Sequence, residues 1–196
     1  MSEDYLLKSK TVWENCQKHI EIFHKSPPEI QRESPIEAIQ NYLTQHLLVV
    51  LCAEIEEHIR GFISERAEKA NDPAIKVLVD SWAAERIRSV KYDQLIGIIK
   101  IFGEDYKQYF ESLLGDDREQ IISAYGIAVK GRINTAHYTG IQSQTTMMDF
   151  EKGLESAEKI LQAFRKTLNS PISSSPPNPP PSDEYTVPTS EASCAR

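Results

Sequence analysis

The sequence predicts an all-helical domain followed by a disordered, proline-rich tail. Apolar residues recur at three- and four-residue steps through most of the first 168 residues, which is the period of one helix face. No stretch alternates between apolar and polar residues as a half-buried strand does. We therefore expect an up-and-down helical bundle over residues 1–168. Residues 169–196 are dominated by Pro and Ser and should form a disordered tail with polyproline character, either solvated or a ligand of an SH3-type domain.

The first two helices are expected over residues 4–25 and 35–69. Pro27 and Pro28 end the first, and Ser34 is the expected N-cap of the second. The first helix has apolar residues on one face, namely Leu6, Leu7, Trp13, Cys16, Ile20 and Phe23. The second has a longer apolar stripe, formed by Ile39, Leu43, Leu47, Val50, Leu51, Ile55, Ile59 and Phe62. Because no Pro interrupts this stripe, the second helix should be the backbone of the fold.

Turn signals divide the rest of the domain. Asp72 can cap a helix that begins at Pro73, and Thr146 with Asp149 can cap the last helix, over residues 147–168. Between them we expect helices over residues 91–102 and 104–114 and a longer one that starts after Asp116 or Asp117. Gly103 and Gly115 are the expected stops. The helix at Pro73 carries the apolar residues Ile75, Val77, Leu78 and Trp82.

Composition and charge exclude several classes of protein. The 196 residues carry a net charge of −7, which argues against broad, nonspecific coating of nucleic acid. No apolar run reaches the roughly 18 residues of a membrane span, and the first residues lack a signal peptide's basic start and apolar core. Cys16, Cys52 and Cys194 match neither a disulfide framework nor a metal-ligand spacing. These features predict a cytoplasmic protein with reduced thiols, no membrane partner, no metal and no cofactor.

Arg132 and His137 are the most informative residues for function. They stand five positions apart at the end of a helix whose apolar stripe includes Ile121, Tyr125 and Val129. Arg carries a permanent charge on a planar group that suits phosphate oxygens, and His exchanges a proton near neutral pH. Together they suit proton transfer on a bound phosphodiester without a metal. The alternative is structural, with an acidic partner for Arg132 and a hydrogen bond for His137 near the helix end.

Helix geometry limits how the pair can act. On an ideal helix a five-residue step separates two side chains by about 140°. The pair can therefore share a site if the Arg132 side chain wraps around the helix, if the helix unwinds before Gly140, or if a second subunit contributes. The apolar stripe and the long second helix also suggest apolar surface left over for a homodimer.

Glu54 is the second unusual residue, because it lies within the apolar stripe of the second helix. A carboxylate on an apolar face destabilises the fold unless it has a partner. The sequence offers two possible partners for Glu54. His58, four residues later, can hydrogen-bond to Glu54 within the helix, or Glu54 can support Arg132 across the bundle.

The helix order, the segment LLVVLCAEIEEHIRGFI and the later segment RINTAHYTG resemble the HEPN superfamily, and within it the RiboL-PSP type. The resemblance covers residues 35–168. It implies a homodimeric bundle and, in active members, a metal-independent endoribonuclease with Arg and His from both subunits at the interface. The matching positions are Arg132 and His137. Ile133 stands where the family usually has a polar residue. Tyr138 and Thr139 separate His137 from Gly140, whereas in the family a glycine often follows the histidine at once.

The function expected from this resemblance is RNA cleavage of a toxin or defence type. The 2′-hydroxyl of RNA would attack the adjacent phosphorus, with His137 exchanging protons and Arg132 holding the phosphoryl oxygens. Glu54, Asn134 and Tyr138 would support the pair. The expected partners are RNA, a second copy of the chain, and an antitoxin or regulatory protein. The alternative is a non-catalytic helical dimer that acts as an interaction or RNA-binding module, which the acidic charge and Ile133 favour.

Overall fold

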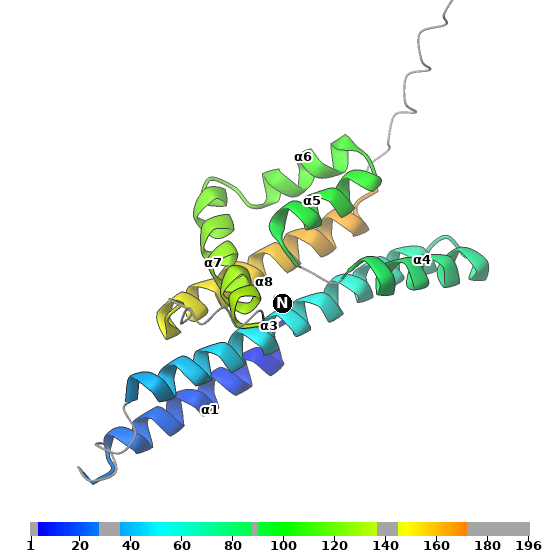
Figure 1. Cartoon of the computed structure of the whole chain (residues 1–196). Helices are drawn as coiled ribbons and strands as arrows, with labels where there is room; N and C mark the ends of the chain where they lie inside the picture. The colour runs from blue at the N-terminus through cyan, green and yellow to red at the C-terminus, as the bar shows by residue number, and fades with distance from the viewer. Residues whose placement is uncertain (1–3, 28–35, 88–89, 137–144, 172–196) are drawn as a thin grey trace, which may run out of the picture.

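The computed structural model describes residues 4–27, 36–87, 90–136 and 145–171. These residues form helices connected by short turns, so the all-helical prediction is confirmed for them (Figure 1). The helices are α1 (Leu7–His24), α3 (Ile36–Glu68), α4 (Pro73–Arg86), α5 (Tyr92–Ile101), α6 (Glu104–Leu113), α7 (Arg118–Ala136) and α8 (Met147–Asn169). The predicted N-cap of the second helix, Ser34, and most of the predicted tail lie outside the described residues.

The predicted turn signals form the expected caps. The Asp72 carboxylate accepts the backbone N–H groups of Ala74 and Ile75 at the start of α4. Thr146 and Asp149 form a reciprocal capping box at the start of α8. Gly103 and Gly115 have φ angles of +128° and +67°, which side chains with a Cβ rarely adopt. These glycines therefore separate α5 from α6 and α6 from α7, as the sequence predicts.

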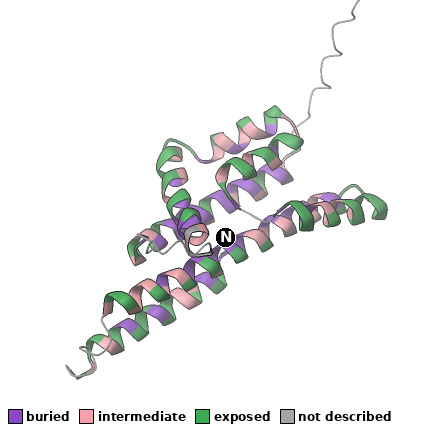
Figure 2. Cartoon of the chain, in the orientation of Figure 1, coloured by how far each residue is buried: buried purple, intermediate pink, exposed green. Residues whose placement is uncertain are grey.

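Helix α3 organises the domain, because α1, α4, α7 and α8 all pack against it. Figure 1 shows α1 alongside its N-terminal half and α4 alongside its C-terminal end. The apolar stripe of α3 is buried where these helices meet, and Figure 2 shows this buried band running through the centre of the molecule. The buried residues of the predicted stripe are Leu47, Leu51, Ile55, Ile59 and Phe62. Ile39, Leu43 and Val50 are only half-buried, whereas Leu48 and Ile63, which the predicted stripe does not include, are buried.

Helices α7 and α8 pack very closely at one point. A Cβ atom added to Gly153 on α8 would lie 2.5 Å from the Cβ of Ala128 on α7. No side chain larger than a hydrogen fits at residue 153 unless the helices separate. Phe150, Leu154, Ile160, Leu161 and Phe164 of α8 are buried, as their spacing predicts.

Two predicted apolar faces are only partly buried. In α1, Leu6, Cys16 and Ile20 are buried but Leu7 is exposed, because the first turn presents Leu7 to the outside. In α4, Ala83 is the one buried residue, while Val77 and Leu78 are among the most exposed large apolar side chains that the structure describes. Periodicity identifies an apolar face, but it does not say whether another element covers it.

None of the helices within the described ranges combines the length and apolar character that a membrane span requires.

Candidate functional site

The C-terminal part of α7 meets α3 where Gly131 allows a close approach. A Cβ at residue 131 would lie 2.8 Å from Cδ1 of Leu48 and 2.5 Å from Oγ1 of Thr145. The two neighbours come from α3 and from the segment before α8. Glycine therefore fixes the distance between the end of α7 and both elements. Arg132 is the next residue, so this contact also determines the position of the candidate functional arginine.

Arg132 is partly buried and lies close enough to Cys52 on α3 for its charge to act on the thiol. Burial raises the pKa of Cys52 to about 12, and the positive charge of Arg132 opposes that rise. The carboxylate of Glu56, also on α3, adds to it. Arg132 and Glu56 therefore both lie near the Cys52 thiol, and we call these three residues the Arg132 group.

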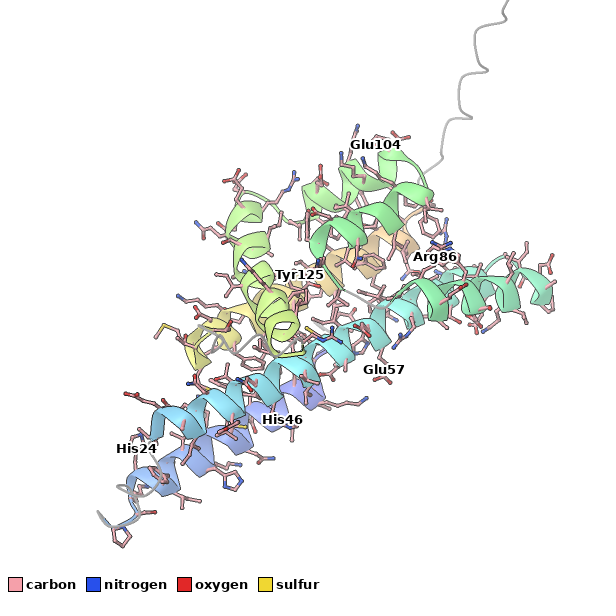
Figure 3. The ribbon with its side chains drawn as sticks, in the orientation of Figure 1. His24, His46, Glu57, Arg86, Glu104 and Tyr125 are labelled. Carbon is pink, nitrogen blue, oxygen red and sulfur yellow. The ribbon has the colours of Figure 1, made fainter. Side chains whose placement is uncertain are left out.

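Tyr125 lies on α7 at the inner edge of this group, in the middle of the molecule (Figure 3). Its hydroxyl donates a hydrogen bond to the backbone carbonyl of Val90, which precedes α5. Burial raises the pKa of Tyr125 well above its ordinary value, and the nearby Cys52 and Glu56 act in the same direction. Tyr125 therefore remains a neutral donor that ties α7 to the start of α5.

The other predicted residues of the site lie partly or wholly outside the described residues. His137 and Tyr138 follow the last residue of α7, Ala136, and the structure does not describe them. The backbone of Asn134 belongs to α7, but its side chain is not described. Because α7 stays helical from Arg132 to Ala136, the predicted unwinding does not occur within that segment. The helical separation of about 140° therefore applies up to the residue before His137.

Glu54 has neither of the two partners expected from the sequence. Its side chain is buried and faces α1. One carboxylate oxygen accepts the backbone N–H of Lys8 at 2.9 Å, and the other accepts the N–H and the hydroxyl of Ser9 at 2.8 and 2.6 Å. Leu6, the N-cap residue of α1, supplies no side-chain cap. Glu54 therefore caps the first turn of α1. The prediction that Glu54 supports Arg132 across the bundle is wrong.

His58 lies one helical turn after Glu54 and also holds the N-terminal segment. Its Nε2 donates to the backbone carbonyl of Tyr5 at 2.5 Å, because a carbonyl oxygen can only accept. The His58 ring contacts the ring of Tyr5 edge-on and stacks on Phe62. In place of the predicted Glu54–His58 hydrogen bond, Glu54 accepts three hydrogen bonds and His58 donates one, all of them with residues 5–9.

Cys52 and Glu56 are the members of the Arg132 group that sequence reasoning missed. The sequence pattern assigns no role to Glu56 and predicts Cys52 only as a reduced thiol. They stand four residues apart, which puts them on one face of a helix. This four-residue spacing is visible in the sequence and could have identified Cys52 and Glu56 as neighbours. The crossing of α7 over α3 at this point, which brings Arg132 to them, depends on tertiary packing at Gly131.

A groove of about 470 Å³ lies on another part of the surface, between the N-terminal segment and α8. Asp4, Lys10, Glu158 and Lys159 are among the residues that line it. Lys10 forms ion pairs with Asp4 at 2.7 Å and with Glu158 at 2.6 Å, so these charges neutralise one another within the groove. Among the residues that the structure describes, no three His, Cys, Asp or Glu side chains are placed to hold a metal ion.

No family model, no curated protein and no solved structure matches this chain.

Proposed function

We propose that the chain is a metal-independent endoribonuclease of the HEPN type, with Arg132 and His137 as its catalytic residues. The observation that carries the proposal is the position of Arg132. It lies in the last two turns of α7, five residues before His137, and it is only partly buried. A guanidinium group that keeps some exposure at a helix end can bind a phosphate oxygen. The resemblance of the segment RINTAHYTG to the HEPN superfamily supplies the reaction.

The reaction follows from the chemistry of the two side chains. The 2′-hydroxyl oxygen of RNA forms a bond to the adjacent phosphorus, while the bond from phosphorus to the 5′-oxygen breaks. One His137 accepts the proton of the 2′-hydroxyl, and a protonated His137 from a second copy donates a proton to the leaving 5′-oxygen. Arg132 stabilises the charge that grows on the phosphoryl oxygens. The products are a 2′,3′-cyclic phosphate and a 5′-hydroxyl.

A second copy of the chain is part of the proposal, because a five-residue step on an ideal helix would turn Arg132 and His137 about 140° away from each other. A twofold arrangement can bring Arg132 of one copy toward His137 of the other. The apolar stripe beside Arg132 does not provide the surface, since Ile121, Tyr125 and Val129 are buried within the single chain. The prediction that this stripe leaves apolar surface for a homodimer is therefore wrong. Exposed apolar residues on the same two helices include Val49 on α3 and Ile127 on α7.

The experiment compares RNA cleavage by the wild type and three variants in EDTA, with a matched DNA strand as the negative control. Arg132→Ala and His137→Ala should each lower the single-turnover rate by about 100-fold or more. Lys130→Ala removes an exposed positive charge from the same helix and should keep the rate within about threefold, because surface charges act mainly on association. DNA lacks the 2′-hydroxyl and should stay intact.

Two results would reject the nuclease. One is cleavage that requires magnesium, and the other is cleavage that persists in both Arg132→Ala and His137→Ala. A folded wild type that binds RNA without cutting it would favour the interaction module. That module is consistent with the net charge of −7 and with Ile133, which packs against the hydrophobic core.

A further inference from the structure

Tyr125 has a buried side chain whose polar atom makes a long-range hydrogen bond. The side chain is fully buried, and its hydroxyl donates to the backbone carbonyl of Val90, 35 positions away in the sequence. A phenylalanine would fill the same space without a polar atom that needs a partner, so packing alone does not account for the hydroxyl. The hydroxyl adds a fixed point between α7 and the residue that precedes α5.

The connection from α4 to α5 is itself held in place. Ile87 and Val90 are each 1% exposed and belong to the hydrophobic core. The guanidinium group of Arg60 on α3 donates to the backbone carbonyl of Ile87 at 3.1 Å. The connection therefore receives one hydrogen bond from α3 and one from α7. Because Ile87 and Val90 are only three residues apart, these two bonds link α3 to α7.

Helix α7 also meets α3 directly, at Gly131. A Cβ at residue 131 would lie 2.8 Å from Cδ1 of Leu48 on α3. Tyr125 and Gly131 are six residues apart, which is about 9 Å along a helix. A rod held at one point can turn about that point, whereas a rod held at two points has a fixed direction. Apolar packing is non-directional, so these two contacts determine the direction of α7 relative to α3.

The placement of Arg132 depends on both contacts, because Arg132 follows Gly131 and lies on the same side of α7 as Tyr125. Seven residues turn an ideal helix to within about 20° of two full turns. Tyr125 and Arg132 also share a neighbour on α3, the thiol of Cys52. A movement of Tyr125 away from Val90 would therefore carry the guanidinium group of Arg132 along α3.

We propose that Tyr125 is a positioning residue for Arg132, acting through its hydrogen bond to the Val90 carbonyl. This role rests on the proposed nuclease reaction, in which Arg132 stabilises charge on the phosphoryl oxygens. Such a donor acts at full strength only where the charge develops, and an error of about 1 Å in its position can lower a rate by up to about 100-fold. Arg60 belongs to the same arrangement, because it attaches to α3 the connection to which Tyr125 bonds.

A purely structural role for the Tyr125 hydroxyl has a different consequence. The loss of one buried hydrogen bond would then lower stability and leave Arg132 in place in the folded molecules. Ser9 provides the comparison, because its buried hydroxyl also donates a long-range hydrogen bond, to Glu54 at 2.6 Å. Ser9 lies on α1, which packs mainly against α3. Tyr125→Phe and Ser9→Ala should therefore lower the melting temperature by similar amounts, about 2–4 °C.

The first test compares single-turnover cleavage at saturating RNA by the wild type, Tyr125→Phe and Ser9→Ala, at a temperature where circular dichroism shows all three to be folded. Tyr125→Phe should lower the rate by about 10-fold, because Arg132 is displaced from the growing charge. Its affinity for RNA should stay within about threefold of the wild type, since Arg132 keeps its charge. Ser9→Ala should cleave within about twofold of the wild type. Equal rates for the two variants would overturn the proposal and leave the nuclease standing.

Arg60→Met tests whether the two hydrogen bonds act through one connection. Methionine keeps an apolar stem in place of the arginine stem and removes the donor to Ile87. The variant should also lower the rate at saturating RNA, by about 3–10-fold. The double variant with Tyr125→Phe should stay within about twofold of the slower single variant, because a link broken at one end is already lost. Effects that multiply would overturn the link through this connection.

A measurement on Arg132 itself needs no cleavage. The Nε–H signal of Arg132 in a nitrogen-15 NMR spectrum is identified by its absence from Arg132→Lys. This signal should move in Tyr125→Phe and stay in place in Ser9→Ala. Because phenylalanine keeps the aromatic ring, a moved signal reports a displaced guanidinium group and not a lost ring. An unmoved signal in Tyr125→Phe would overturn the proposal.

The rate and the NMR signal together separate this proposal from the nuclease. If the wild type binds RNA without cutting it, the nuclease proposal fails, and the signal alone decides whether Tyr125 positions Arg132. If the wild type cuts RNA, the expected result is a moved signal with a lowered rate in Tyr125→Phe. A moved signal with an unchanged rate would overturn the proposal, because the reaction would then not depend on the placement that Tyr125 provides.

Discussion

The carboxylate of Glu54 accepts the hydroxyl of Ser9 at 2.6 Å, joining residues 45 positions apart in the sequence. The same carboxylate accepts two backbone N–H groups of the first turn of α1. These N–H groups have no acceptor within their own helix. A residue of α3 thus performs the role that a Ser, Thr, Asp or Asn at the N-cap usually performs for its own helix.

Glu54→Ala should lower the free energy of unfolding by about 1–3 kcal/mol, because two backbone N–H groups and the buried Ser9 hydroxyl lose their acceptor. Urea denaturation followed by circular dichroism measures the change. Glu57→Ala is the control, since Glu57 also pairs with the N-terminal part of α1, through Lys8, but is mostly exposed. Its variant should change stability by less than about 1 kcal/mol. Equal effects of the two variants would contradict the cap.

Gly131→Ala should destabilise the fold by about 1–3 kcal/mol, because the added methyl group overlaps Thr145 and Leu48. Gly126→Ala lies on the same helix, where a Cβ would meet nothing within 4 Å. It should stabilise the fold by about 0.5–1 kcal/mol, as Ala does in place of Gly within a helix. Thermal melting of the two variants and the wild type shows whether each substitution raises or lowers the stability. A stabilising Gly131→Ala would mean that α7 and α3 are farther apart than described.

Stability should fall as the pH rises above 9. The pKa of Cys52 is near 9 in the unfolded chain and about 12 in the fold. Between these values the unfolded chain releases a proton that the folded chain keeps, so each pH unit removes up to about 1.4 kcal/mol of stability. Below pH 9 this contribution is constant. Urea denaturation at several pH values measures the slope.

The matched variant for this pH dependence is Cys52→Ala, which loses the thiol. Other groups titrate in the same range, including Tyr125, whose pKa is also raised. The difference in slope between wild type and variant therefore isolates Cys52. Equal slopes would show that the thiolate forms as easily in the fold as in the unfolded chain.

Ending the chain after Pro171 should leave the melting temperature unchanged within about 2 °C, because a segment dominated by Pro and Ser buries little apolar area. The cut is placed there because Ser170 still belongs to the fold. Its backbone N–H donates to the carbonyl of Thr167, and its own carbonyl accepts the Tyr106 hydroxyl. A drop of several degrees would show that residues 172–196 bind to the helical domain.

The sequence predicts most of the helices well because local signals bound them. Asp72, Thr146, Gly103 and Gly115 act within a few residues of their own position, so their effect is visible in the sequence. The start of α4 and both ends of α5, α6 and α8 accordingly lie within about two residues of their predicted positions, which is the usual spread among assignments.

The candidate site is less predictable because it depends on which helices meet. The anomaly of Glu54 was visible, since a carboxylate on an apolar stripe needs a partner, but the partner is a backbone turn of α1. Backbone groups carry no sequence signature. The proximity of Arg132 to Cys52 was missed for a related reason. Gly131 sets where α7 crosses α3, and that crossing brings Arg132 near Cys52.

The cap that Glu54 gives to α1 also sets an order of events during folding. Leu6 offers α1 no cap of its own, so the start of this helix gains its hydrogen bonds only after α3 has formed and packed against it. Helix α1 should therefore be absent from the rate-limiting transition state, and Ser9→Ala should accelerate unfolding while leaving the refolding rate almost unchanged. During synthesis the first helix of the chain would be one of the last to become stable, and its surface would stay open until residue 54 has been made.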